Sequence, residues 1–172
     1  MVEPVPDVAV VIVNWNTRPL LADCLKSLPP AAGLLRLETW VVDNGSTDGS
    51  QALVTRDFPG VNLIANEGNR GFAAANNQAL RQARGRFFLL LNSDARPQPG
   101  ALERLVQTMT DHPDIGLAAA QLLNADGSLQ NSAAAEPSLA TELLNKSLLR
   151  RLHPRRLPRA FPPRPNRWRW KP

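Results

Sequence analysis

The chain has 172 residues, of which 43% are hydrophobic, and this is enough for one domain with a sizeable core. No stretch is long and apolar enough to span a membrane, and the N-terminal segment lacks the pattern of a secretory signal. The formal net charge of +5 comes from the last part of the chain, because all 15 acidic residues precede Lys146. The remainder is mildly acidic, so a nucleic-acid-binding surface is not expected.

Four short strands are predicted, and each is followed by polar or glycine-rich residues and then by a helical pattern. The strands are rich in β-branched and other apolar residues and lie at 8–13, 40–43, 61–65 and 87–91. The helices that alternate with them are expected near 18–28, 49–57, 70–83 and 99–110. This alternation predicts an α/β fold with a mostly parallel, Rossmann-like sheet flanked by helices. The polar ends of the strands are then expected to gather in one cleft.

Start signals are present for three of the helices. Asp48 is expected to cap the second helix, with Gln51 three residues later as in a capping box. Asn69 is expected to cap the third helix, and Pro99 suits the first turn of the fourth. The single cysteine, Cys24, lies in the amphipathic pattern of the first helix, and we expect a buried core residue there. With one cysteine no intrachain disulfide can form, which fits a reducing cytoplasm.

The strand at 87–91 is the most informative segment. Its five consecutive apolar residues predict a strand buried on both faces. It runs directly into Asn92, Ser93 and Asp94. A carboxylate at the carboxyl end of a parallel strand suits a hard metal ion that carries phosphates. The alternative is an ordinary turn, since these residue types all favour turns; the polar ends of the other three strands favour a site.

Beyond the fourth helix the pattern changes twice. Residues 115–122 read as another strand, and the turn signal at 124–127 predicts a short β-hairpin near 116–131. We expect an α/β domain over 1–137, a leucine-rich amphipathic helix over 138–152, and a basic Pro- and Arg-rich tail over 153–172 that is disordered. An uncovered leucine face would promote self-association.

Five motifs in this chain resemble the family 2 glycosyltransferases of the GT-A fold, and the closest likeness is to the rhamnosyltransferase-like branch. They are VVIVNWNT at 10–17, VVDNGSTDGS at 41–50, NEGNRGFAAANN at 66–77, LLNSDA at 90–95 and LLNADGSLQ at 122–130. They follow the family's order over roughly residues 8 to 132, which makes the resemblance a strong signal. It implies inverting transfer of a sugar from a dTDP- or UDP-linked donor to a hydroxyl of an acceptor glycan or lipid-linked glycan, in the synthesis of cell-surface polysaccharide or glycoconjugate.

The resemblance also implies a set of binding residues at the matching motif positions. Asp94 would bind Mg²⁺ or Mn²⁺, and Asn92 stands where the stricter motif has its first Asp, so it either ligates or merely caps the strand. The residues expected to bind the nucleotide sugar are Asn14, Asn16, Asp43, Asn44, Asn66, Asn69, Arg70, Gly71, Asn76 and Ser93. Asp43 would accept from a uracil- or thymine-type imide N–H or from a ribose hydroxyl.

Several of these residues have a plainer alternative. Asn69 would cap a helix whether or not it meets a phosphate or sugar oxygen, and Arg70 is equally expected as a solvated surface residue. Trp15 faces either the nucleotide or the core, and the core is the commoner place for an aromatic ring.

The family pattern is incomplete after residue 132. Family members usually continue into an acceptor-binding half with a Glu-Asp or Asp-Asp motif that supplies the catalytic base. Glu136 and Glu142 are the only acidic residues there, and neither has a matching context. We therefore expect a truncated, nucleotide-sugar-binding half with no assigned catalytic base.

Three other functions compete with this one. A non-catalytic nucleotide-sugar-binding module, or a partner subunit without the base, is the main alternative. The basic tail suggests an arm for anionic lipid or nucleic acid, and with lipid the chain would sit at the inner face of the membrane. A dinucleotide-dependent dehydrogenase is excluded, because its G-x-G-x-x-G turn would follow the first strand, where this chain has Asn14–Thr17.

Overall fold

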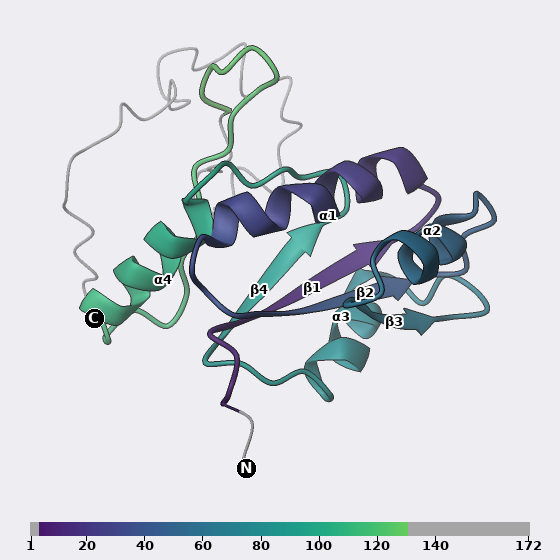
Figure 1. Ribbon diagram of the computed structural model, residues 1–172, viewed down its shortest axis with the longest axis horizontal. Coiled ribbons are helices and arrows are strands. Elements are labelled where there is room, and N and C mark those ends of the chain that lie inside the picture. The colour runs from purple at the N-terminus through teal and green to yellow at the C-terminus, as the bar shows by residue number, and fades with distance from the viewer. Residues whose placement is uncertain (1–3, 131–172) are drawn as a thin grey trace, which may run out of the picture. The chain divides into compact units, whose positions relative to one another are not determined.

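Figure 1 shows the computed structural model of the chain, in which residues 4–130 are described. The chain divides into two units after Ala118. The first unit contains the elements β1 (Val8–Asn14), α1 (Arg18–Ala32), β2 (Leu37–Asp43), α2 (Ser50–Asp57), β3 (Asn62–Ala65), α3 (Phe72–Leu80), β4 (Phe87–Asn92) and α4 (Ala101–Asp111). The expected helix at 138–152 and tail at 153–172 lie outside the described residues.

The strands form one parallel sheet in the order β3-β2-β1-β4. β1 is central to this arrangement, since it pairs with β2 on one side and with β4 on the other. Its Val11 stands opposite Trp40 and Leu90, and its last residue, Asn14, stands opposite Asp43. The predicted α/β fold with a parallel sheet and flanking helices is confirmed.

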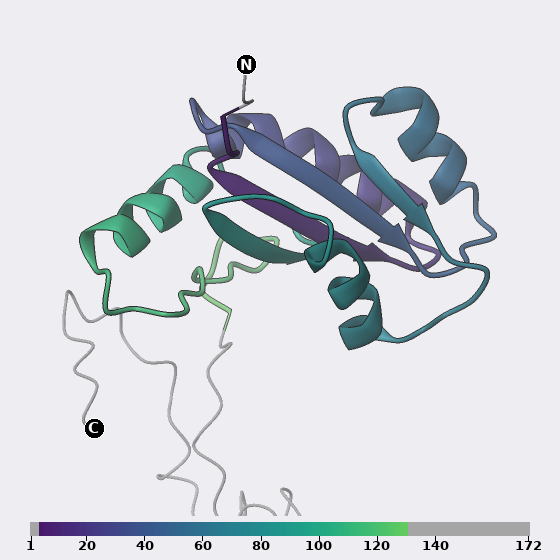
Figure 2. The same ribbon diagram turned by 90° about the horizontal axis from the view of Figure 1, so that it is seen from below.

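Two layers of helices cover the sheet, as Figures 1 and 2 show. Helices α1, α2 and α4 lie over one face, and α3 lies over the other. The core of the first layer includes Ile12, Leu21 and Val41, all fully buried. The smaller core under α3 consists of Val11, Val42, Ala75 and Ala79. Alanine at the two helical positions lets α3 approach the sheet closely.

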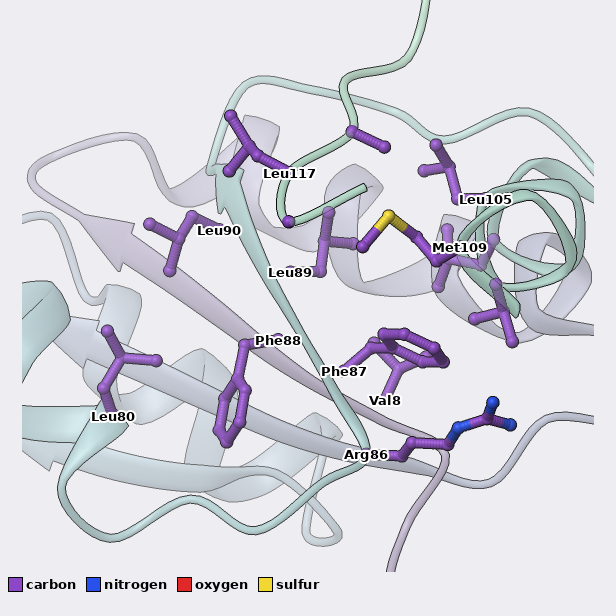
Figure 3. A pocket seen from close by; sticks show the side chains of 14 residues that line it. Val8, Leu80, Arg86, Phe87, Phe88, Leu89, Leu90, Leu105, Met109 and Leu117 are labelled. Carbon is purple, nitrogen blue, oxygen red and sulfur yellow. The ribbon is translucent and has the colours of Figure 1, made fainter. Parts of the chain in front are cut away.

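The prediction that β4 is buried on both faces is wrong for the part of the chain that the structure describes. Alternate side chains are exposed, with Phe88 and Leu90 showing 50% and 49% of their surface. Figure 3 shows these two on one side of β4 and Leu89 with Met109 on the other. The reason is that α3 packs mainly over β1 and β2, whereas β4 is an edge of the described sheet.

Helix α1 is longer than the pattern predicted, because it continues through Pro29 and Pro30 into a last turn. Proline interrupts the hydrogen-bond ladder of a helix, which is why the end was expected near residue 28. The last turn is held by tertiary packing, since Ala31 is fully buried in the core. The carbonyls of the two prolines also accept hydrogen bonds from the N–H groups of Gly33 and Gly100, at 3.2 and 3.1 Å.

The predicted helix starts are corrected in detail. The Asp48 carboxylate accepts hydrogen bonds from Ser50 at the start of α2, but Gln51 does not complete a capping box because its amide donates to Asp43 instead. Asn69 accepts from the N–H of Gly71 just ahead of α3. Pro99 precedes the first residue of α4 by two positions and is not part of its first turn.

The second unit is described over residues 119–130. Here the hairpin turn forms, with Asn124 N–H donating to the Ser128 carbonyl at 2.8 Å and one antiparallel bridge between Leu123 and Leu129. Gly127 takes the left-handed conformation that such a turn requires, with φ of 81°. The strand predicted over 115–122 does not form, and its residues are mostly exposed.

Because Ile12 is fully buried and Leu90 is half exposed, their substitution should lower the free energy of unfolding by different amounts. Ile12→Ala should lower the free energy of unfolding by about 2–5 kcal/mol, because it removes a fully buried side chain from the larger core. Leu90→Ala should cost less than about 1 kcal/mol, because that side chain is half exposed. Urea denaturation of both variants measures the two values. Equal losses would show that Leu90 is buried in solution and contradict its exposed position.

Candidate functional site

The carboxyl ends of all four strands lie at one edge of the sheet, because the strands are parallel. This brings together the polar ends that the sequence predicted, at Asn14, Asp43, Asn66 and Asp94. Asp43 and Asp94 are separated in the sheet order only by β1. In open parallel sheets ligands bind at this edge, where the chain leaves the strands in loops.

Asp43 is the most enclosed polar group of this edge. Its side chain is fully buried at the end of β2. Oδ1 accepts hydrogen bonds from the backbone N–H of Ser46 and from Gln51 Nε2, both at 2.8 Å, and Oδ2 accepts from Asn14 Nδ2 at 2.8 Å. The carboxylate therefore holds the loop after β2 against the end of β1.

A chain of hydroxyl groups continues from β1 to the end of β4. Thr17 Oγ1 donates to Asn14 Oδ1 at 2.6 Å and lies 2.9 Å from Ser93 Oγ. Because the single Thr17 proton goes to Asn14, Ser93 must be the donor in the second bond. The loop that carries Asp94 is thus tied to β1 through two hydroxyls.

On the other side, a set of amides ties β2 to β3 and α3. Asn66 Nδ2 donates to Asn44 Oδ1 at 3.0 Å and to Gln78 Oε1 at 2.8 Å, and Gln78 returns a bond to Asn66 Oδ1 at 3.0 Å. Asn44 Nδ2 donates to Asn69 Oδ1 at 3.3 Å, which also accepts from the N–H of Gly71. Hydrogen bonds therefore connect all four strand ends.

The expected binding residues fall into two groups by exposure. The buried ones are Asn14, Asp43, Asn44, Asn66, Asn76 and Ser93. The exposed ones are Asn16, Asn69, Arg70, Gly71, Asn92 and Asp94. The buried group builds the edge, and the exposed group is what a ligand from solvent meets first.

The loop after β1 presents an aromatic ring beside this edge. Trp15 is 55% exposed, so the expectation that its ring packs in the core is wrong. Its neighbour Asn16 has a left-handed backbone with φ of 53° and bonds to the loop after β2, donating its N–H to Ser46 Oγ and accepting from the N–H of Thr47, both at 2.8 Å. These bonds fix the loop on which the exposed ring stands.

Asp94 and Asn92 offer oxygen ligands suited to Mg²⁺ or Mn²⁺. Both residues are exposed, and neither side chain makes a hydrogen bond to the residues that the structure describes. Within the same residues there is no cluster of three or more His, Cys, Asp or Glu side chains around a common point. One carboxylate and one amide fit a metal that takes its remaining ligands from substrate phosphates and water.

The pKa values of two buried groups agree with these contacts. Burial alone would raise the pKa of the Asp43 carboxyl, but hydrogen bonds from Ser46, Gln51 and Asn14 outweigh burial and hold the pKa below its ordinary value of 3.8. Burial, with a smaller contribution from Asp94, raises the pKa of the Cys24 thiol to about 12. Cys24 is therefore a protonated core residue, as the sequence predicted.

An apolar pocket of about 430 Å³ lies along β4, and it is separate from this edge. Figure 3 shows its lining by Phe87, Leu89, Met109 and other apolar side chains. Arg86 and Phe87 lie at the amino end of β4, opposite to the strand ends that carry the polar network. The pocket has little of the hydrogen-bonding capacity that a nucleotide needs.

Three network residues were missed by the sequence analysis: Thr17, Ser46 and Gln78. Ser46 and Thr17 lie within recognised motifs, but nothing in their residue type distinguishes a partly buried hydrogen-bond partner from a turn residue. Gln78 follows the motif at 66–77 on α3, and its pairing with Asn66 depends on the position of that helix against β3. Gln51 was noted only as a capping residue.

Comparison with known proteins identifies the family. The family model described as glycosyl transferase family 2 matches residues 9–166. The chain therefore belongs to this family, which confirms the resemblance seen in its five motifs and the transferase class that it implied.

Individual relatives agree with the family and are much longer than the matched region. The succinoglycan biosynthesis protein ExoO of Rhizobium meliloti (strain 1021) is 35% identical over 107 residues, which are 62% of this chain and 30% of that protein. An N-acetylglucosaminyl-diphospho-decaprenol L-rhamnosyltransferase of Mycobacterium tuberculosis (strain ATCC 25618 / H37Rv) is 28% identical over 141 residues, 76% of this chain and 46% of that protein. The match thus spans less than half of either relative.

A solved structure supports the GT-A assignment. The structure of S. aureus TarS 1-349 in complex with UDP-GlcNAc matches with a TM-score of 0.52 and 27% sequence identity. The match covers 62% of this chain and 32% of that chain.

The close approach of two loops at this edge predicts that Gly45 is required. Its φ is 80°, and a Cβ atom there would lie 2.7 Å from the Gly68 Cα. Gly45→Ala should therefore lower the free energy of unfolding by about 1–3 kcal/mol. Gly60→Ala is the matched control, since nothing lies within 4 Å of its Cβ position. Equal melting temperatures for the two variants would contradict the tight contact.

The low pKa of Asp43 predicts how stability depends on pH. A carboxyl whose pKa is lowered by folding contributes stability above its unfolded value, here 3.8, and loses it as the pH falls through the lower folded value. Asp43→Asn should lower the free energy of unfolding at pH 7 by about 1.5–3 kcal/mol, since an amide N–H₂ would face donors. The loss of stability between pH 5 and pH 2 should also be smaller in this variant. Unchanged acid sensitivity, with the exposed Asp114→Asn as control, would rule out this role.

Proposed function

We propose that this chain binds a nucleoside diphosphate sugar, UDP- or dTDP-linked, at the carboxyl edge of its sheet. The observation that carries the proposal is the hydrogen-bonded set of polar side chains that connects all four strand ends. It rests on family membership, on the exposed groups beside that edge, and on the fold shared with TarS, whose structure contains UDP-GlcNAc.

The nucleoside would lie over the ends of β1 and β2. The exposed ring of Trp15 offers a stacking surface for a base, and Asn16 stands next to it on a loop fixed by two hydrogen bonds. Asp43 Oδ2 accepts one hydrogen bond from the described residues, but its side chain is fully buried, so an imide N–H or a ribose hydroxyl would reach it only after a movement of the loops around it. Because Asp43 is buried, it would act mainly by holding the loops that receive the nucleoside.

The diphosphate would lie toward the end of β4. Asp94, with the Asn92 amide oxygen, would hold Mg²⁺ or Mn²⁺ there. A bound divalent cation supplies positive charge against a departing diphosphate. Asn69, Arg70 and the backbone at the start of α3 are exposed on the neighbouring loop and would meet phosphate or sugar oxygens.

The acceptor would be a hydroxyl of a glycan or a lipid-linked glycan. This proposal draws on the name of the Mycobacterium tuberculosis relative, an L-rhamnosyltransferase of a decaprenol-linked sugar. No helix within residues 4–130 has the length and hydropathy to cross a bilayer. The basic segment 153–172 is the candidate for a contact with the inner face of a membrane.

A second candidate function is binding of the donor without sugar transfer. It is favoured because neither Asp43 nor Asp94 is free to act as a general base. A general base must be free to take the proton of the acceptor hydroxyl. Asp43 is enclosed by three donors, and Asp94 would be occupied by the proposed metal. Loss of a general base typically lowers a rate by ~10²–10⁴-fold, so sugar transfer by this chain alone should be close to background. Transfer that is robust, and is lost on Glu136→Ala or Glu142→Ala, would identify a base that we have not assigned.

Metal-dependent nucleotide binding tests the proposed site directly. Calorimetric titration with UDP and dTDP, in the presence of Mn²⁺ and with EDTA, should show binding that depends on the metal. Asp94→Ala should reduce that binding by at least about tenfold, since it removes the carboxylate that we place on the ion. Asp114→Ala, which removes an exposed carboxylate elsewhere, is the control. Metal-independent binding that is unchanged in Asp94→Ala would refute the metal site.

A further inference from the structure

The Asn76 side chain has a free oxygen inside the protein. Among the described residues only two buried side-chain polar atoms lack a hydrogen-bond partner, Trp40 Nε1 and Asn76 Oδ1. Asn76 is only 4% exposed, and its Nδ2 donates to the Phe72 carbonyl at 2.9 Å. Because a carbonyl can only accept, this bond fixes the orientation of the amide and leaves the oxygen as the free end.

The packing of α3 shows which way Asn76 faces. Ala75 and Ala79 contact the sheet over β1 and β2. Leu80, on the same helix, lines the pocket along β4 with Phe88, and Figure 3 shows it on the side of β4 where Phe88 and Leu90 lie. Residues four apart share a helix face, so Asn76 lies on the β4 side of α3, one turn before Leu80.

The direction of α3 places Asn76 close to the candidate site. The helix begins just after the loop at the carboxyl end of β3, so its first turns are nearest to that edge. On β4, the side chains facing the same way are Phe88, Leu90 and then Asn92 toward the carboxyl end. Asn76 is therefore nearer than Leu80 to the carboxyl edge of the sheet, the edge at which β4 ends in Asn92 and is followed by Asp94.

We propose that Asn76 Oδ1 accepts a hydrogen bond from a hydroxyl group of the transferred sugar and so positions the sugar beside β4. This inference rests on the proposed function, which places the nucleoside over β1 and β2 and the diphosphate at β4. In that order the sugar is the part of the donor that lies beyond the diphosphate. A free buried acceptor is costly without a partner, and a sugar hydroxyl can supply the missing proton, whereas an ionised phosphate oxygen cannot.

The other unpartnered atom does not share this location. Trp40 lies three residues before the end of β2 and stands opposite Val11 in the middle of the sheet. Its indole N–H is therefore away from the strand ends, and only Asn76 combines a free polar atom with a position near the site.

The test compares a nucleotide with and without its sugar. Titrations of the full chain with UDP and UDP-GlcNAc, and with dTDP and dTDP-glucose, all with Mn²⁺, give the contribution of the sugar to affinity. Asn76→Ala should weaken the sugar-bearing ligand by about 3- to 10-fold, the value of one hydrogen bond, and leave the bare diphosphate unchanged. Asn77→Ala, at the exposed neighbouring position of the same helix, should change neither affinity.

Each other outcome counts against the inference. An equal loss of UDP and UDP-GlcNAc binding would mean that Asn76 serves the fold, the nucleotide or the metal, and unchanged binding of both would mean that it has no role. Alanine is favourable in a helix, so the variant should fold; Asn76→Leu, which is of similar size, provides the same comparison, and melting temperatures verify both. Failure of the unsubstituted chain to bind either diphosphate would refute the proposed function, and this inference with it.

Discussion

A single buried carboxylate, that of Asp43, organises the edge of the sheet on which the candidate site depends. A carboxylate without compensation is costly inside a protein, so its burial requires donors from several directions. They come from the end of β1, from the loop after β2 and from the first turns of α2, through Asn14, Ser46 and Gln51. The hydrogen bonds to this one carboxylate therefore align three segments that are separate in the sequence: the end of β1, the loop after β2 and the start of α2. The same interactions keep the carboxyl ionised, which makes the arrangement self-consistent.

Hydrogen bonds between uncharged side chains connect Asp43 to the rest of the site. On one side, Asn14 accepts a hydrogen bond from Thr17, which is bonded to Ser93 after β4. On the other side, the backbone N–H of Asn66 donates to the Asp43 carbonyl at 2.8 Å, and the Asn66 side chain bonds to Gln78 on α3. Each of these residues is buried or partly buried, so the loops that carry the exposed groups start from fixed points. Trp15, Asn69 and Asp94 are one to three residues away from such a point. A ligand site built in this way has a rigid base and an accessible rim.

The sequence was most informative where a local pattern decides the outcome. The strands, the alternating helices and the polar strand ends follow from hydrophobic periodicity and turn residues. The structure contains all three features. What could not be predicted depends on contacts between distant segments. The exposure of Phe88 depends on how far α3 reaches across the sheet, and the continuation of α1 through Pro29 depends on the burial of Ala31. The same holds for Gln51, whose local pattern suggests a helix cap but whose partner is Asp43. The exposure of Trp15 is likewise set by the bonds of Asn16 to another loop.

The chemical character of the edge is mainly that of amides, and this bears on the kind of ligand it suits. Asn14, Asn44, Asn66 and Asn69 satisfy one another and their neighbours without adding charge. A cluster of carboxylates in their place would repel a diphosphate, and a cluster of basic residues would bind anions without regard to the sugar. Here the Asp43 carboxylate is enclosed by three donors, and Asp94 stands exposed after the end of β4, where a divalent cation would reverse its effect on an anion. Amides donate and accept in fixed directions, so they are suited to base edges and sugar hydroxyls, which also do both. Asn76 Oδ1, a buried acceptor without a partner among the described residues, lies on the β4 side of this neutral set, where a group bearing hydroxyls and no charge would complete it.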